Sequence, residues 1–190
     1  PSVVGEAKLW LDATNVDGKQ NNTLSNDSSI SEWKDLSGNV NDEKITNDSL
    51  FPKFKTNQIN NLPSIEFNRD YIEFNDLVDI RSVFFVLKKD LSDTSYSSFL
   101  GDDHNYHFHG GLSSILGINE GWVHHHISSG KTFQNGKKIN PGTIRYTPNY
   151  EIISIITSGN VEASRIGGDR SLSNQYWKGN ISEVIIFNKQ

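Results

Sequence analysis

The chain has 190 residues, a length that allows one domain with a substantial core, and we expect a single domain over residues 1–190. Its formal net charge of -5 argues against nucleic acid as a partner, because binding to a phosphate backbone requires clustered Lys and Arg. Cysteine is absent, which excludes disulfides and thiolate metal ligands.

Two further features of the composition concern the context of the chain. No apolar run approaches the roughly eighteen residues of a membrane span, so we expect no insertion into a membrane. Methionine is absent even from position 1, and we therefore expect a segment of a longer protein.

The first third of the chain alternates between short apolar strands and polar loops. In residues 8–13, Leu9 and Leu11 share one face and Trp10 the other, which predicts a strand. Residues 14–29 contain almost only polar residues and predict a long solvated loop. Residues 30–41 predict a second strand with two apolar anchors, which ends in a Ser-Gly-Asn turn.

The remaining strands predict an all-β fold. Residues 64–68 and 71–74 alternate with period two, which predicts a half-buried antiparallel pair. Three runs are apolar on both faces and predict central strands, at 80–89, 152–156 and 184–187. Asn135-Gly136 predicts a tight hairpin turn. No segment has the pattern of an amphipathic helix, so we predict a two-sheet antiparallel jelly-roll sandwich.

The loop after the first strand carries part of a calcium-loop pattern. Asn15, Asp17 and Gly18 stand where the third, fifth and sixth residues of such a loop would stand. The first ligand position would be Ala13, which has no oxygen in its side chain, although Asp12 could substitute from one residue away. A plain surface turn is the alternative.

Residues 97–111 are the densest stretch of ligand chemistry. They place two carboxylates, three imidazoles and the phenol of Tyr106 ahead of a glycine pair, and all six histidines of the chain fall between His104 and His126. Asp102 and Asp103 stand at a predicted bend, where carboxylates can bind calcium, accept sugar hydroxyls or cap the turn. We take both as candidate metal ligands and Asp103 also as a ligand-binding residue.

The histidines of this stretch are candidate binding residues. On a strand, His107 and His109 would leave the same face, with Phe108 entering the core. Paired imidazoles can hold a transition metal or grip a carboxylate or a sugar hydroxyl. Two hydrogen-bonded polar residues on a sheet surface are the alternative.

A second histidine cluster follows at residues 124–126. On a strand, His124 and His126 would share a face, joined by the ring of Trp122, on which a sugar or a proline could stack. Core packing is the alternative for Trp122. The triplet does not by itself predict a zinc site, because three ligands must converge and strand neighbours diverge.

The last candidate residues stand beside the Gly167-Gly168 turn. Arg170 could hold a ligand carboxylate in a two-pronged hydrogen bond, and Asp169 beside it is a third candidate calcium ligand. A salt bridge from an arginine of this turn to Asp102 or Asp103 is the alternative.

Four segments carry a family resemblance. In order, they resemble the laminin-G-like, concanavalin A-like jelly rolls of bacterial surface proteins: residues 9–13, 33–39, 63–67 and 177–187. Within that superfamily, residues 99–102, 106–109 and 168–170 look like ligand-binding modules near the tips of giant repeat-containing adhesins. The resemblance implies a secreted bacterial surface protein that grips a peptide terminus or a glycan with the help of calcium.

We therefore expect a monomeric binding module of a bacterial adhesin, with calcium as cofactor and an extracellular peptide or glycan as ligand. Its binding rim would comprise residues 102–109, 119–126 and 165–170. We predict no enzyme activity, because no paired carboxylate motif, Gly-x-Ser-x-Gly elbow, phosphate loop or His-Glu-x-x-His helix is present. A polysaccharide hydrolase or lyase on the same fold and a structural spacer are the alternatives.

Overall fold

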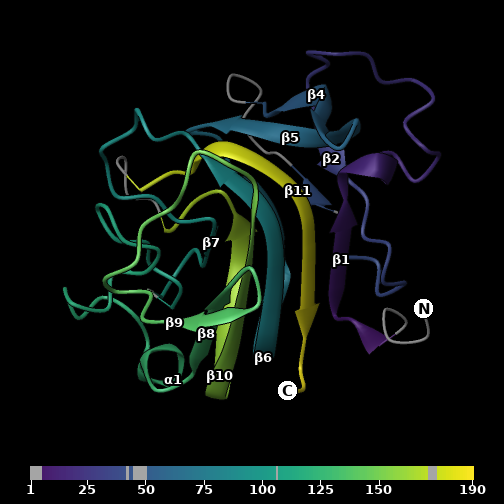
Figure 1. Ribbon diagram of the computed structural model, residues 1–190. Coiled ribbons are helices and arrows are strands. Elements are labelled where there is room, and N and C mark those ends of the chain that lie inside the picture. The colour runs from purple at the N-terminus through teal and green to yellow at the C-terminus, as the bar shows by residue number, and fades with distance from the viewer. Residues whose placement is uncertain (1–5, 42, 45–50, 106, 171–174) are drawn as a thin grey trace.

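The computed structural model describes residues 6–41, 43–44, 51–105, 107–170 and 175–190. These residues form an almost entirely β structure of antiparallel strands, consistent with a sandwich. Figure 1 shows the long strands running side by side through the middle of the molecule. The strands, in chain order, are β1 (Leu9–Asp12), β2 (Glu32–Trp33), β3 (Glu43–Lys44), β4 (Lys53–Ile59), β5 (Leu62–Asn68), β6 (Ile72–Lys89), β7 (Leu100–Gly101), β8 (Lys131–Gln134), β9 (Lys137–Ile139), β10 (Glu151–Ile166) and β11 (Lys178–Phe187).

The two longest strands, β6 and β10, lie at the centre of the sheet. They pair antiparallel along most of their length, with register shifts between Ile156 and Arg165. Their two halves have different neighbours, because β11 and β8 pair with one half and β3 and β7 with the other. The main path of the sheet is β4-β5-β11-β6-β10-β8-β9, and β1 pairs with β11.

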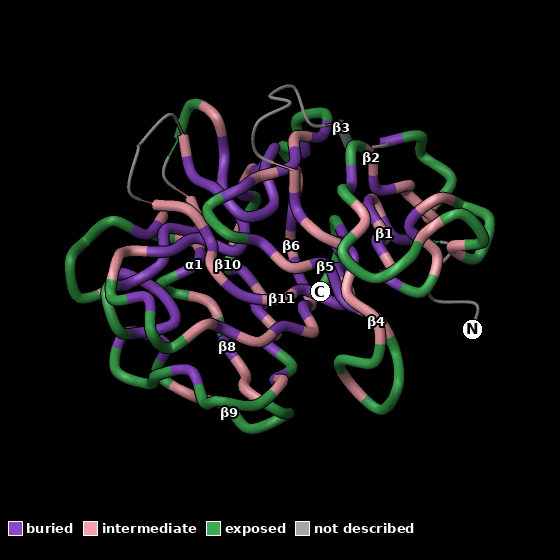
Figure 2. The backbone as a smooth tube through the Cα atoms, turned by 90° about the horizontal axis from the view of Figure 1, so that it is seen from above, coloured by how far each residue is buried: buried purple, intermediate pink, exposed green. Residues whose placement is uncertain are grey.

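The core lies between these strands and the loops that cover them. Phe99, just before β7, packs edge to face on Phe85 of β6, with 4.8 Å between ring centroids, and also contacts Trp177. All three side chains are fully or almost fully buried. Figure 2 shows the buried residues along the central strands and the exposed ones along the outer loops. An aromatic cluster of this size contributes strongly to the hydrophobic stabilisation.

Several sequence predictions about strands are confirmed. β1, the apolar run in β6 and the runs in β10 and β11 form strands where we expected them. The hairpin of β8 and β9 turns at Asn135 and Gly136, which both have positive φ, as this tight turn requires. Within the described residues, the only α-helix is the single turn α1 (His125–Ser128). No helix of the described chain is long and apolar enough to cross a membrane.

Two predictions about strands were wrong. The strand expected over residues 30–41 is reduced to Glu32–Trp33, because the flanking segments turn and bond through side chains, with Asp35 accepting from the backbone amides of Trp10 and Ser37. The expected pair of residues 64–68 with residues 71–74 does not form. β5 pairs with β4 and β11 instead, and the second segment is the start of β6, which pairs with β10.

Candidate functional site

The turn after β7 is closed by the side chain of Asp102. β7 pairs with the end of β10, and Asp102 Oδ1 accepts hydrogen bonds of 2.8 Å from the backbone amides of His104 and Asn105. Ser164 donates its hydroxyl to Asp102 Oδ2 at 3.2 Å. An aspartate that accepts from amides two and three residues ahead is a typical turn former. Asp102 is therefore buried and held, while Asp103 lies nearer the surface.

The turn that carries Arg170 lies against this aspartate turn. The Arg170 amide donates to the Asp102 carbonyl oxygen at 2.6 Å. Gly101 allows the approach, because a Cβ there would lie 2.1 Å from the Gly168 carbonyl oxygen. Two turns some sixty-five positions apart thus meet at one edge, as the sequence prediction required.

Arg165 fixes the second turn from inside the fold. Its guanidinium binds Glu73 Oε1 through Nε and Nη2, at 3.0 and 2.6 Å, and its Nη1 donates to the Arg170 carbonyl oxygen at 2.6 Å. The guanidinium also stacks over the Tyr71 ring at 4.8 Å. The salt bridge that we offered as the alternative, from this turn to Asp102 or Asp103, is not the observed pairing. Arg165 pairs with Glu73, and Arg170 Nη2 lies 3.3 Å from Asp169 Oδ2.

His107 and His124 form one wall of a recess. The expectation that His107 and His109 lie on a strand was wrong, because the turn at Asp102 ends β7 at Gly101. The ring of His107 stacks on that of His124, with centroids 4.5 Å apart. Glu162 donates its backbone amide to His107 Nδ1 at 3.2 Å, and its carboxylate lies 3.1 Å from His107 Nε2. The recess has a volume of about 520 Å³, and its lining also includes Asn105, Val123 and His125.

Burial changes the protonation of both stacked histidines. Desolvation lowers the pKa of His107, although the negative charge of Glu162 opposes this shift. Desolvation also lowers the pKa of His124, and the neighbouring histidines lower it further. Both imidazoles are therefore neutral near pH 7, and each offers one acceptor nitrogen. That nitrogen of His107 accepts the Glu162 amide, and His124 Nδ1 accepts from the amide of His126 at 3.2 Å.

His109 and Trp122 line a second recess beside the first. His109 is buried, and its ring centroid lies 5.1 Å from that of Trp122, which in turn packs on Tyr96 at 4.9 Å. Trp122 keeps 38% of its surface exposed, so it is not a core residue. The recess has a volume of about 360 Å³ and is completed by Gly121, Arg170 and Gln175. A partly exposed aromatic ring thus lies beside a guanidinium and an amide.

The histidine triplet was assigned to the wrong element. Residues 124–126 do not alternate as on a strand, because His124 caps α1 and the next two histidines lie within it. The His126 ring lies 5.2 Å from that of His124 and also contacts Ser158, with 3.1 Å between its Nδ1 and the Ser158 hydroxyl. Trp122 and His124 consequently face different recesses, although Gly121 borders both.

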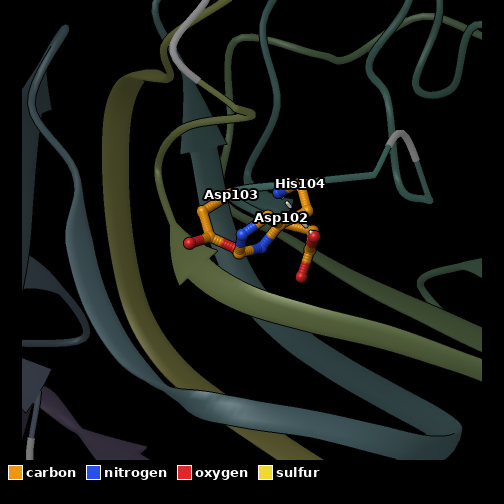
Figure 3. A group of neighbouring side chains, drawn as sticks. All are labelled: Asp102, Asp103 and His104. Atoms are coloured by element: carbon orange, nitrogen blue, oxygen red, sulfur yellow. Dashed lines mark hydrogen bonds and ion pairs between the residues drawn. The ribbon is translucent and has the colours of Figure 1, made fainter.

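A group of possible metal ligands lies at the aspartate turn. One ligand atom each from Asp102, Asp103 and His104 falls within 4.8 Å of the others, and Figure 3 shows the Asp103 carboxylate and the His104 imidazole turned toward each other. Asp169, the third carboxylate that we predicted, is not part of this group. It is fully buried, and its Oδ1 has no hydrogen-bond partner among the described residues. Burial raises the pKa of Asp169, while the charges of Arg170 and His109 partly oppose this.

The loop at residues 15–18 has the geometry of a plain turn. Asp17 Oδ1 accepts from the amides of Lys19 and Asn21, at 2.7 and 2.9 Å, and Asn15 Oδ1 accepts from the amide of Gln20 at 2.6 Å. The oxygens that would bind calcium are thus engaged with the backbone. This favours the surface-turn alternative over the calcium-loop interpretation.

Two residues of the recesses were not predicted from the sequence. Glu162 and Gln175 line them, and the Glu162 carboxylate is contacted by the amide of Asn105, which lies within the predicted rim. The only signal was that Glu162 alternates with the apolar Val161 and Ala163, which marks an outward position but not its neighbours. Tyr106, which we predicted to bind ligand, lies outside the described residues.

The chain was compared with known proteins in three ways. No protein-family model matches it, and no curated protein or solved structure matches it significantly.

Proposed function

We propose that the chain is a calcium-assisted binding module of a bacterial surface adhesin, which recognises a peptide terminus or a glycan. The observation that carries this proposal is the hydrogen bond between the Arg170 amide and the Asp102 carbonyl oxygen. It brings the arginine turn to the aspartate turn, so that Arg170 lines a recess with Trp122 and His109. The location outside the cell and the adhesin context rest on the resemblance of the sequence.

The two recesses supply the chemistry that such a ligand needs. Arg170 can donate two hydrogen bonds to a carboxylate, and the exposed part of the Trp122 ring can pack on a sugar ring or an apolar side chain. His124 and Asn105 next to them can exchange hydrogen bonds with hydroxyls or amides. A concave site with few polar groups around an aromatic surface is typical of small-ligand binding.

Calcium would be held at the aspartate turns. Calcium prefers carboxylate and carbonyl oxygens. Asp102 and Asp103 belong to the group at the first turn, where Asp102 Oδ1 already accepts from two amides, and Asp169 offers a carboxylate in the second turn, outside that group. Asp169 Oδ1 has no partner in the described part of the chain, and this is the best single reason for a cation there, because a buried carboxylate oxygen without a hydrogen bond is costly. When bound, the ion would lower the cost of burying Asp169 and stiffen the two turns.

Peptide ends and acidic glycans share a carboxylate next to an apolar or sugar face, so the test must separate them. The chain would be applied to a peptide array with free and amidated C-termini and to a glycan array with acidic and neutral members, with and without calcium. The proposal expects a calcium-dependent set of hits on one array that is lost in Arg170→Ala. Empty arrays, or hits unchanged in Arg170→Ala and Trp122→Ala, would refute it and leave the spacer interpretation.

A further inference from the structure

A third cavity opens beside the end of β6, lined by different residues from the two recesses. It has a volume of about 380 Å³, within the range of small-molecule sites. Its polar lining includes Lys89, Asp93 and Tyr146, with Arg145 at the surface, and its apolar lining includes the exposed side chains of Leu91 and Leu112. No residue of the binding rim lines it.

Three of its polar side chains are buried, and each has one polar atom without a hydrogen bond among the described residues. The exposed fractions of Lys89, Asp93 and Tyr146 are 6%, 8% and 7%, and Lys89 Nζ, Asp93 Oδ2 and Tyr146 Oη have no hydrogen-bond partner among the described residues. Lys89 Nζ and Asp93 Oδ2 lie 3.6 Å apart, which is an ion pair but longer than a hydrogen bond. Buried polar atoms are nearly always satisfied, so three unsatisfied atoms beside one cavity mark it as a candidate binding site.

The fold holds these three groups in place. The Lys89 ammonium lies over the Trp177 ring, 5.4 Å from its centroid, and Tyr146 packs edge to face on the same ring at 5.4 Å. Asp93 Oδ1 accepts from the hydroxyl of Ser95 at 2.7 Å, which leaves Oδ2 for another donor. Because of these contacts, the three side chains cannot easily rotate to reach solvent or another hydrogen-bond partner.

The charges of the lining select the chemistry of the ligand. Lys89 and Arg145 carry two positive charges, and Asp93 carries one negative charge. The lining is therefore net positive and favours an anion, although the chain as a whole is acidic. Desolvation lowers the pKa of Lys89, and an anion beside it would favour its charged form. A donor on the same ligand would give Asp93 Oδ2 a hydrogen bond, and an apolar body would cover the two leucines.

We propose that this cavity binds a small hydroxy acid with an apolar body. Its carboxylate accepts hydrogen bonds from Lys89 and Tyr146, its hydroxyl donates to Asp93 Oδ2, and its body packs on Leu91 and Leu112. Each of the three buried groups then has a partner. This site is separate from the proposed rim and does not depend on it.

The test is calorimetric titration of the wild-type chain with 3-phenyllactate. Two matched compounds each lack one group, namely 3-phenylpropanoate without the hydroxyl and 3-phenylpropane-1,2-diol without the carboxylate. We expect 3-phenyllactate to bind and both analogues to bind at least about tenfold more weakly, since each leaves a buried polar group unpaired. No binding of 3-phenyllactate, or equal binding of the analogues, would overturn the proposal.

Two variants locate the binding. Tyr146→Phe removes only a hydroxyl that has no partner among the residues described, so the free variant is expected to be at least as stable as the wild type. Its affinity for 3-phenyllactate is expected to fall about tenfold. Tyr150→Phe is the matched control, because the Tyr150 hydroxyl bonds Ser64 outside the cavity, and it is expected to keep full affinity. Binding that is unchanged in Tyr146→Phe would contradict the proposed site.

Discussion

The guanidinium of Arg165 links Glu73 to the carbonyl oxygen of Arg170. Arg165 binds Glu73 Oε1 through two nitrogens and donates to the Arg170 carbonyl oxygen from a third, at 2.6 Å. This fork connects the start of β6, the end of β10 and the turn that carries Arg170. The orientation of the proposed rim therefore depends on a residue that lines neither recess.

A lysine cannot reproduce this fork. Arg165→Lys keeps the charge but loses the planar set of donors, so the hydrogen bond to the Arg170 carbonyl oxygen or those to Glu73 are lost. We expect the free energy of unfolding to fall by about 1–3 kcal/mol, measured by urea denaturation. Lys8→Met, the control, removes an exposed ion pair with Asp79. It is expected to change the free energy of unfolding by less than about 1 kcal/mol. Equal effects of the two variants would contradict this role of Arg165.

Phe108 anchors the loop that carries His107 and His109. Its ring is fully buried in the core between the two histidines in sequence. Phe108→Ala is expected to lower the free energy of unfolding by about 3–5 kcal/mol, because it leaves a cavity. Val78→Ala, at a position that is 62% exposed, is expected to change it by less than about 0.5 kcal/mol. If Phe108→Ala unfolds at the same urea concentration as Val78→Ala, the loop is not anchored in this way.

The lowered pKa values of His107 and His124 predict how stability depends on pH. As pH falls below about 6.5, the ordinary pKa of histidine, the unfolded imidazoles take up protons before the folded ones. The unfolded state then binds more protons, so the free energy of unfolding decreases from pH 7.5 to pH 5.5. The stabilisation is complete above the unfolded pKa and is lost as the pH falls through the window between the unfolded and folded values.

The variant His107→Gln tests this assignment. Groups whose charge acts on His107 include Glu162, Asp102 and Asp169, and all of these remain in the variant. The raised pKa of Asp169 works in the opposite direction at lower pH, because there the folded state binds more protons. We expect urea midpoints to fall less between pH 7.5 and 5.5 in His107→Gln than in the wild type. An identical decrease in both would show that His107 is not responsible.

Calcium is expected to stabilise the free chain through Asp169. At a concentration about 100 times its dissociation constant, a ligand that binds only the folded state adds roughly 2.7 kcal/mol. Asp169→Asn is expected to remove most of this increment, measured as the rise in melting temperature on adding calcium. Asp17→Asn, in the other loop with a calcium-like pattern, is the matched control and is expected to keep it. A calcium increment that persists in Asp169→Asn and disappears in Asp17→Asn would place the ion elsewhere.

The strands were largely predictable because local pattern determines them. Alternation in β1 and the apolar runs of β6, β10 and β11 predict strands without knowledge of their partners, and Asn135-Gly136 predicts its own turn. The partners themselves were not predictable in every case. Residues 64–68 and 71–74 are close in sequence, but β5 pairs with β11, which lies more than one hundred residues later. The choice of partner strand depends on long-range contacts, which the sequence of one segment does not contain.

The candidate site was only partly predictable for a related reason. Histidines at positions 107, 109, 124 and 126 can be read as strand residues from their spacing. Hydrogen bonds from backbone amides to the side chains of Asp102 and His124 instead turn the backbone at these places. Glu162 was missed because it contacts His107, whose ring stacks on that of His124. The loops that carry these two histidines meet only in the folded chain. The approach of Asp102 to Arg170 was predicted from the chemistry of the two turns.

The most direct test of the proposed rim is an amide and indole NMR titration of the wild-type chain, in calcium, with the ligand selected from the arrays. The account predicts that the indole signal of Trp122 shifts together with amides in residues 102–105, 119–126 and 162–170, while the buried Trp33 indole does not. Shifts confined to residues outside these three segments, with Trp122 unchanged, would contradict it.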